Sequence, residues 1–430
     1  MKNQSRQGKM WLLSGVVLIF MFTAFGLLAA GAFAAEKTTI TVLSSDDFAA
    51  FRKAAIPDFE KANPDIKVNL ISVGYDQLHD KIVTALAGGA TGFDVIDVDE
   101  IWTAEFVEAG FLADVTDRVT AEMKKGIVPA GMNILTYQNR FWGLPMFVDT
   151  KFFYYNNDLL AKAGFKTPPQ TWAEFVEQSK KLQEKKLVKY ATIWGWGQHE
   201  GLICDVVSIF PAFGGRFIEP NGKFVVNNPD NVRALQFMVD LLYKYKAADP
   251  ASITADDRSM LNSFIAGDVA FGLNWSFAWG IIDDPSQSKV AGKVRLALMP
   301  GEKKKSASGA GSMGLGIASG SRRKDAAWKF IAFLAERQQQ KNQAINYGAL
   351  PIWQSLYTDP EVQKKHPALA EMSSQLKYAV SRPRLTWYSE FSRVLQLEVH
   401  NALTQNKSPK QALDDAQKEI ERLAKKYGNK

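Results

Sequence analysis

The sequence predicts an α/β protein built from two lobes, and three observations support that prediction. Strand-like and helix-like segments alternate at short intervals in the first half of the chain, as in a mostly parallel sheet with helices on its faces. The roughly 400 residues after the N-terminal leader exceed what one hydrophobic core usually holds. No stretch rich in Pro, Gly and Ser separates two contiguous domains, so we expect the chain to cross between the lobes more than once.

The segment that follows the leader supplies the alternation. Residues 38–43 and 66–73 have the apolar, β-branched character of strands, and residues 93–98 form a third such segment. Apolar residues at helical spacing follow each strand, and Gly88 and Gly110 are suited to end two of these helices. The helices predicted here cover residues 48–62, 75–86 and 101–109.

The longest strand-like stretch after the leader runs from Gly143 to Leu160. Aromatic and β-branched residues dominate it, and Pro145 lies near its start, where a missing N–H does little harm to a strand ladder. Residues 156–158 then offer side-chain oxygens to begin a helix. Asp149 lies alone among these apolar residues. It is either a bend residue or hydrogen-bonded buried acid, or a ligand contact on a segment that passes from one lobe to the other.

The second half of the chain continues as α/β and becomes largely helical. Capping boxes begin two of its helices, at Thr171 with Glu174 and at Ser408 with Gln411. The helices predicted here cover residues 172–186, 229–242, 259–266, 326–334, 391–403 and 409–426. The predicted strands cover residues 190–194, 269–275, 294–298 and 314–317.

The N-terminus has the organisation of a secretory signal peptide. Lys2, Arg6 and Lys9 form a basic region, and residues 10–30 form an apolar one. An Ala-Phe-Ala motif ends at Ala34, so we expect cleavage after this residue and a mature protein in the periplasm. An uncleaved anchor is the alternative, because the apolar run is almost long enough to cross a bilayer.

The charge and cysteine content narrow the functional classes. Without the leader the chain has 52 − 3 = 49 basic residues against 45 acidic ones, an excess of +4. Because this small excess is dispersed along the chain, we predict that the protein does not bind nucleic acid. Cys204 is the only cysteine, so no intramolecular disulfide can form, and we expect its thiol to be buried.

The sequence lacks the common catalytic and cofactor motifs. The four His residues are not spaced as a metal pair, and HExxH, CxxC, G-x-S-x-G and the phosphate loop are missing. We therefore predict no metal, no cofactor and no catalytic residues. Residues 309–314 match G-x-G-x-x-G, but a dinucleotide site needs a helix after this motif, and here a strand-like segment follows. We interpret these glycines as close-packed or hinge backbone.

Carboxylates and tryptophans gather at the predicted strand ends and in turns beside glycine. They include Asp47, Asp99, Trp102, Trp194, Trp196 and Trp275. Ligands of open α/β sheets bind at the carboxyl ends of the strands. An aromatic ring can pack on the C–H face of a pyranose while carboxylates accept hydrogen bonds from its hydroxyls, so the set predicts a carbohydrate ligand. Helix N-capping by the acids stays open as the alternative.

Five blocks of the sequence also occur in the order typical of one known family. They are residues 93–96 with Asp99, Trp102 and 109–115; residues 143–145 with Asp149 and 154–156; residues 213–215, 221–223 and 228–229; residues 264–270 with Trp275; and Arg382-Pro383 with 408–409 and 412–413. Together these blocks resemble the extracellular solute-binding proteins of family 1. Members of that family, maltose-binding protein among them, are the sugar-binding components of ABC importers.

The resemblance implies the type II periplasmic binding fold. In that fold two α/β lobes are joined by crossing hinge segments and close around a ligand in the cleft. Crossings are then expected at residues 148–150, near residues 309–314 and near Trp353. The implied limits are residues 36–149 plus 315–352 for lobe one and residues 150–314 plus 353–430 for lobe two, after a signal peptide of residues 1–34.

The resemblance also implies a set of ligand-binding residues. The main candidates are Asp99, Trp102, Asp149, Trp275 and Arg382. Further candidates are Asp47, Tyr75, Trp194, Trp196, Trp353 and Tyr388. The loop at residues 44–47 has no aromatic residue where many sugar-binding members have Trp or His, so the size and identity of the sugar stay open.

The predicted function is to bind a mono- or oligosaccharide and to deliver it to the membrane permease of an ABC importer by hinge closure. We expect a monomer that catalyses nothing. One alternative keeps the fold and replaces the sugar by a polyol, a glycerol phosphate or a polyamine. A phosphate would need several converging cations, and only Arg382 is well placed, whereas a polyamine would use the same carboxylates and rings. The other alternative is a secreted glycosidase, although no acid pair for it stands out.

Overall fold

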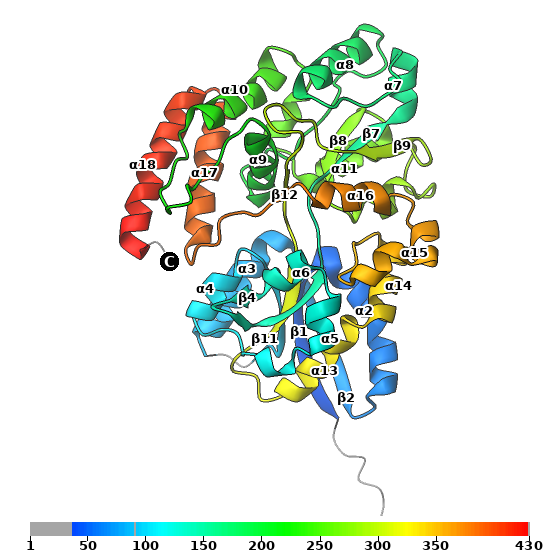
Figure 1. The fold of residues 1–430 in the computed structure, drawn as a ribbon, viewed down its shortest axis with the longest axis vertical. Coiled ribbons are helices and arrows are strands. Elements are labelled where there is room, and N and C mark those ends of the chain that lie inside the picture. The colour runs from blue at the N-terminus through cyan, green and yellow to red at the C-terminus, as the bar shows by residue number, and fades with distance from the viewer. Residues whose placement is uncertain (1–36, 90–91, 429–430) are drawn as a thin grey trace, which may run out of the picture.

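The computed structural model describes residues 37–89 and 92–428, which form two lobes joined by extended segments (Figure 1). The predicted signal peptide lies outside these residues. Both lobes combine helices with a β-sheet, which confirms the α/β class. Among the helices within the described ranges, none has both the length and the apolar character needed to cross a membrane.

Lobe one, the lower lobe in Figure 1, is built on a five-stranded sheet in the order β2-β1-β3-β11-β6. Strand β11 runs antiparallel to both of its neighbours, while β2, β1 and β3 are parallel. The prediction of parallel pairing is therefore confirmed for β2, β1 and β3, whereas both pairings of β11 are antiparallel. The strands are β1 (Thr38–Ser45), β2 (Ile66–Val73), β3 (Val95–Asp99), β6 (Gly143–Phe147) and β11 (Met313–Ile317).

Helices cover both faces of the lobe-one sheet. The first begins two residues earlier than predicted, because the Ser45 hydroxyl accepts a hydrogen bond from the Asp47 N–H and caps it. Its buried Phe59 packs edge-on against Phe330, with ring centroids 5.0 Å apart. The elements of this lobe are α2 (Asp46–Ala62), α3 (Tyr75–Ala87), α4 (Thr103–Glu108), α5 (Ala121–Gly126), α6 (Pro129–Ile134), the short strands β4 (Thr136–Tyr137) and β5 (Arg140–Phe141), α13 (Lys324–Leu334) and α14 (Arg337–Tyr347).

Lobe two has a smaller, antiparallel sheet in the order β8-β7-β9, surrounded by helices (Figure 1). Its strands are β7 (Phe152–Asn156), β8 (Phe271–Asn274) and β9 (Val294–Ala297). Its helices are α7 (Asn157–Ala163), α8 (Trp172–Glu184), α9 (Glu200–Ala212), α10 (Pro229–Tyr243), α11 (Asp257–Ala266), α12 (Ala278–Ile282), α16 (Leu369–Leu376), α17 (Tyr388–Leu403) and α18 (Pro409–Tyr427). The short helix α15 (Pro360–Lys365) contacts α14, on the path from lobe one to α16.

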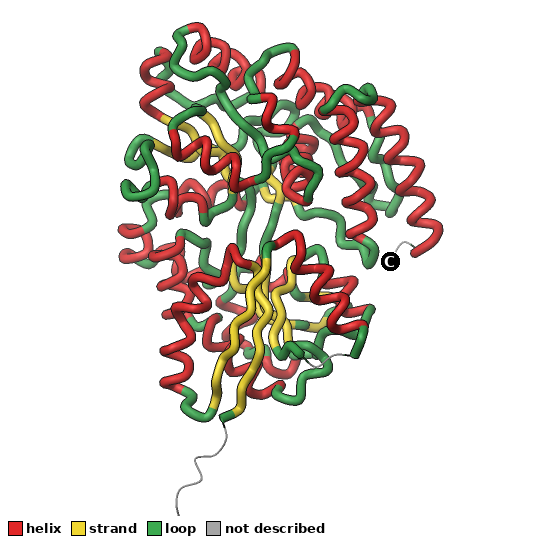
Figure 2. The backbone as a smooth tube through the Cα atoms, turned by 180° about the vertical axis from the view of Figure 1, so that it is seen from behind, coloured by secondary structure: helices red, strands yellow, loops and turns green. Residues whose placement is uncertain are grey.

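The stretch predicted as one strand is two strands in different lobes. Strand β6 ends at Phe147 and β7 begins at Phe152, and residues 148–151 cross between the lobes as expected. The second crossing lies beside the first, since the Lys151 N–H donates to the Gly309 carbonyl at 3.1 Å. A third segment joins them, because β10 (Ser308–Gly309) pairs with β12 (Ala379–Val380). Figure 2 shows extended loop segments, coloured green, that pass between the lobes.

The structure of lobe two differs from the sequence prediction in two further places. Residues 190–194 do not form a strand; only Thr192 makes isolated bridges, to Ala248 and Phe271. Helix α9 was not predicted, because every side chain from Leu202 to Ala212 is buried and the sequence shows no amphipathic period. The interpretation of the G-x-G-x-x-G match agrees with the structure, since strand β11 rather than a helix follows it.

Candidate functional site

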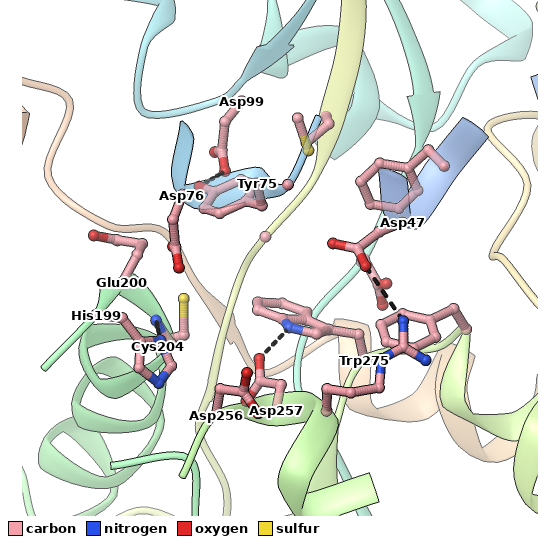
Figure 3. A pocket seen from close by; sticks show the side chains of 18 of the residues that line it. Asp47, Tyr75, Asp76, Asp99, His199, Glu200, Cys204, Asp256, Asp257 and Trp275 are labelled. Atoms are coloured by element: carbon pink, nitrogen blue, oxygen red, sulfur yellow. Dashed lines mark hydrogen bonds and ion pairs between the residues drawn. The ribbon is translucent and has the colours of Figure 1, made fainter. Parts of the chain in front are cut away.

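A cavity of about 240 Å³ lies between the lobes, where four strands of the lobe-one sheet end (Figure 3). Lobe one contributes residues that follow β1 and β2 or end β3 and β6, and lobe two contributes the starts of α9 and α11 and the loop after β8. The side chains of both walls point toward one another in Figure 3. The charged and aromatic residues that line the cavity are Asp47, Phe48, Tyr75, Asp76, Asp99, Phe147, Asp149, His199, Glu200, Asp256, Asp257, Arg258, Trp275, Phe277 and Arg382.

A buried arginine joins the two walls. Arg382 is 3 % exposed, and its guanidinium pairs with Asp99 of lobe one at 2.9 Å and with Glu200 of lobe two at 2.8 Å. Each carboxylate also accepts a tyrosine hydroxyl: Tyr75 donates to Asp99, and Tyr388 donates to Glu200, both at 2.6 Å. Buried charges are stable only when they are paired and hydrogen-bonded. Because the partners of Arg382 come from both walls, this network holds the walls together in this conformation.

Trp275 supplies the largest aromatic surface of the lobe-two wall. It follows β8 directly, and its half-buried ring lines the cavity. The indole N–H donates to Asp257 at 2.8 Å, as the dashed line in Figure 3 shows. The Trp275 carbonyl accepts a hydrogen bond from the Tyr154 hydroxyl at 2.8 Å. The ring is therefore held in place by protein contacts before any ligand arrives.

Asp149 lies on the first crossing and combines both interpretations drawn from the sequence. Its carboxylate is buried and accepts hydrogen bonds from the Thr150 N–H at 2.9 Å and from the Ser276 hydroxyl at 2.8 Å. It also lines the cavity. Burial raises the pKa of this carboxyl to about 7. Asp149 is thus a hydrogen-bonded buried acid whose position still allows contact with a ligand.

Asp47 and Arg258 pair across the outer part of the cavity. Asp47 belongs to lobe one and Arg258 to lobe two, and their charged groups lie 3.6 Å apart. Both side chains are substantially exposed, at 37 % and 53 %. A pair of this kind contributes little energy, but it is a second charged contact between the walls.

The structure brings six of the predicted ligand-binding residues together at this cavity and places five elsewhere. The six are Asp47, Tyr75, Asp99, Asp149, Trp275 and Arg382. Two of the other five lie directly behind the lining. Trp102 is buried and stacks on Tyr75 with ring centroids 5.5 Å apart, and Tyr388 contacts the lining residues Glu200 and Arg382.

The remaining three tryptophans belong to cores. Trp194 and Trp196 are at most 1 % exposed and stack on each other with ring centroids 5.1 Å apart, inside lobe two. Trp353 donates its indole N–H to the Ala335 carbonyl at 2.6 Å and lies under the Arg337 guanidinium. No face of these rings lines the cavity, because protein side chains cover them.

The sequence did not reveal several residues of the lobe-two wall. Glu200 begins a helix that has no amphipathic signal, so nothing in the sequence indicated it. Asp256 caps α11 by accepting from the Ser259 N–H at 2.7 Å, and Asp257 follows it. The two acids stand just before a predicted helix, a position that could have drawn attention to them.

The arrangement is suited to a ligand with hydroxyl groups and an apolar face. Carboxylates accept hydrogen bonds from hydroxyls, and the Trp275 ring offers a flat surface for C–H groups. Within residues 37–89 and 92–428, no group of three or more His, Cys, Asp and Glu side chains converges so as to hold a metal ion.

Comparison with known proteins agrees with this geometry. The solved structure of "Maltose bound T. maritima MalE3" matches the chain with a TM-score of 0.86 and 34 % identity, over 90 % of this chain and all of that one. The fold is therefore that of the two-lobe periplasmic solute-binding proteins. The family model for the bacterial extracellular solute-binding protein matches residues 43–341, and the chain belongs to that family.

Two curated relatives extend the comparison. A "Probable ABC transporter-binding protein" of Deinococcus radiodurans is 29 % identical over 350 residues, covering 79 % of this chain and 81 % of the relative. A "Mannitol-binding protein" of Pseudomonas aeruginosa is 26 % identical over 335 residues, covering 76 % and 75 % of the two chains. The family is described as extracellular, which locates the chain outside the cytoplasmic membrane.

Proposed function

We propose that this protein is the solute-binding component of an ABC importer and that it binds a saccharide or a polyol. The observation that carries the proposal is the cavity between the lobes, where carboxylates from both walls surround the Trp275 ring. Relatives named for maltose and mannitol bind neutral polyhydroxylated molecules, the class for which this set of groups is suited. Closure of the lobes encloses the ligand, and the closed form presents it to a membrane permease.

The proposal assigns ligand contact to the six predicted residues at the cavity, namely Asp47, Tyr75, Asp99, Asp149, Trp275 and Arg382. It assigns the lobes to residues 36–149 plus 315–352 and to residues 150–314 plus 353–430, a limit that lies two residues after the start of the lobe-one strand β11 at Met313. It also assigns a signal peptide cleaved after Ala34 and a periplasmic location. The protein acts as a monomer without a cofactor, without catalysis and without binding nucleic acid.

A phosphate-bearing ligand is less well supported. Arg382 is already shared by Asp99 and Glu200, and Arg258 is paired with Asp47. Neither arginine of the lining is free to neutralise a phosphate without giving up a carboxylate partner.

A cationic ligand such as a polyamine is the second candidate. Seven carboxylates line the cavity against two arginines, an excess of 7 − 2 = 5 acids when His199 is neutral. Carboxylates and aromatic rings together recognise ammonium groups well.

A thermal-shift screen against sugars, polyols and polyamines tests the proposal. A ligand at a hundred times its Kd should stabilise the protein by about 2.7 kcal/mol, which is an easily measured rise in Tm. A rise with maltose, trehalose or mannitol supports the proposal. A rise only with spermidine or putrescine, with an affinity that falls steeply as salt increases, supports the second candidate and contradicts the first.

A further inference from the structure

The Trp275 ring touches both of the neighbouring segments that cross between the lobes. On the first crossing, the Lys151 ammonium lies 4.9 Å from the ring centroid. On the second, Gly311 approaches so closely that a Cβ atom at this position would lie 2.3 Å from the ring atoms Cη2 and Cζ3. No side chain larger than hydrogen fits at residue 311 unless the ring moves.

The contact with Lys151 is held by buried ion pairs. Lys151 is fully buried, and its ammonium lies 2.5 Å from Asp257 and 3.3 Å from Asp205. Burial opposes the charge, but Asp205 and Asp257 outweigh that effect and raise the pKa of Lys151 above its usual value. Asp257 also accepts the Trp275 indole N–H. One carboxylate therefore fixes the ammonium and the ring together.

The two sides of the ring differ in their surroundings. Trp275 lines the cavity, whereas Lys151 does not line it and is 0 % exposed, so the ammonium lies on the side of the ring away from the ligand. A buried lysine over a ring is a cation–π contact, which is favourable when it is desolvated. The ligand side of the ring stays open while the other side is fully supported.

Hinge motion must change the contact between the ring and Gly311. Opening of the lobes requires rotation about backbone dihedrals of the crossing segments, and the Gly311 N–H donates to the Asp149 carbonyl at 3.1 Å on the first crossing. Lys151 is paired with Asp205 and Asp257 of lobe two and moves with the ring, so rotation at the crossings shifts Gly311 against a ring that Lys151 holds in place. A ligand that stacks on the correctly placed ring therefore binds one hinge angle better than the others and shifts the population toward it.

We propose that Lys151 and Gly311 are positioning residues. Both hold the Trp275 ring for ligand stacking, and Gly311 couples its position to the hinge. Lys151 does not line the cavity, whereas Gly311 does, so measurements without ligand are needed to separate its effect on the ring from a direct effect on the ligand. The proposal deepens the function proposed above and rests on it for the ligand, but the coupling between ring and hinge can be measured in the unliganded protein.

Gly311→Ala is the sharpest test, with Gly314→Ala as its matched control. A Cβ at Gly314 would lie 2.4 Å from the Leu144 carbonyl oxygen, so this variant is also crowded, but within the lobe-one sheet. We expect both variants to lower Tm. Only Gly311→Ala should lower the affinity for maltose or mannitol, by at least tenfold in calorimetry. Unchanged affinity in Gly311→Ala, or an equal loss in Gly314→Ala, would overturn the proposal.

Lys151→Met removes the ammonium and leaves the buried Asp205 and the partly exposed Asp257 without their cation, so it can fail for reasons of stability alone. Lys151→Arg keeps a cation near the ring and should retain more affinity than Lys151→Met. If the two variants are equally stable in urea and equally weak in binding, the charge behind the ring plays no part, and the role assigned to Lys151 is wrong.

Measurements without ligand separate this proposal from the proposed function. Gly311→Ala should change the near-UV circular dichroism of the unliganded protein, and the change should vanish in a Trp275→Phe background. It should also shift the radius of gyration in small-angle scattering, because the hinge equilibrium moves. If wild type binds no sugar or polyol of the panel, the proposed function fails, but these two signals still decide the coupling. Their absence would overturn it.

Discussion

Trp275 and the pair Trp194–Trp196 look alike in the sequence and differ in the structure. All three stand near glycines at the ends of predicted strands. The pair stacks almost in parallel, with an interplanar angle of 5°, inside the core of lobe two. Gly195, which lies between the two tryptophans, leaves room for a neighbouring side chain, because a Cβ atom at this position would lie 2.9 Å from Asp257 Oδ1. A ring that protein covers on all sides stabilises the fold, whereas a ring with one open face is available to a ligand.

Trp196→Ala should show the largest effect, and it should be on stability. Removing a fully buried indole leaves a large cavity, which typically costs about 3–5 kcal/mol. Urea unfolding at neutral pH measures the loss, and calorimetry with the sugar found in the thermal-shift screen measures binding. A loss below about 1 kcal/mol would mean that the pair does not have the core role assigned to it.

Trp275→Ala should affect mainly ligand binding. Loss of a central aromatic contact typically costs about 2–3 kcal/mol, or roughly 30- to 150-fold in Kd. The stability loss should be clearly smaller than in Trp196→Ala, since the Trp275 ring is only half-buried. If Trp275→Ala bound the ligand as wild type does and lost more stability than Trp196→Ala, Trp275 would be a core residue and its assignment to the site would be wrong.

A contrast between paired and unpaired groups separates the neighbouring acids Asp99 and Glu100. Both are buried, but Asp99 is paired with Arg382 and Tyr75, whereas Glu100 Oε1 has no partner, and burial raises the pKa of Glu100 to about 7. The folded protein thus holds a proton on Glu100 that the unfolded chain loses near pH 4.5. Stability from this group is present at low pH and is lost as pH rises from about 4.5 to about 7.

Glu100→Gln has no proton to lose, so it should gain stability over wild type across that pH range. The gain should be near zero at pH 4 and reach at most about 3 kcal/mol above pH 7. Urea unfolding as a function of pH measures it, with the exposed Glu177→Gln as control. A gain that does not change with pH would show that Glu100 is not held protonated.

Arg258→Gln should have the smallest effect. Its pair with Asp47 joins the walls but is exposed, so its loss should weaken ligand binding by less than about 1 kcal/mol. The loss of affinity should shrink when the salt concentration is raised roughly fivefold, from about 0.1 M to about 0.5 M, because salt screens exposed charges. Arg422→Gln, which loses a pair within α18, is the matched control and should leave binding unchanged.

The sequence predicted the elements well where their pattern is local. Strand β1 and helix α8 with its cap at Thr171 both follow from residues close together in the chain, whereas the crossing at residues 148–150 was implied by the family resemblance. The sequence prediction failed where the position of a side chain depends on residues that are distant in the chain. The orientation of Trp194 and Trp196 depends on packing against Trp172 and Phe175, which no spacing reveals.

The candidate site shows the same limit. Asp99 and Trp275 could be predicted because Asp99 ends one strand and Trp275 follows another. That Arg382 bridges Asp99 and Glu200 could not, since these three residues lie in distant parts of the chain and one begins a helix without an amphipathic pattern. The family resemblance indicated that Arg382 is a site residue, but it did not indicate that Asp99 and Glu200 are its ion-pair partners.

The late arrival of β11 has a consequence for how the chain is made. This strand lies between β3 and β6, yet it comes from residues 313–317, while its partners are complete by residue 147. Lobe one cannot close its sheet until most of the chain has left the ribosome, and pairing across such distances is slow. For a protein that must cross a membrane before it functions, a sheet that stays incomplete during synthesis keeps the chain unfolded enough to be exported.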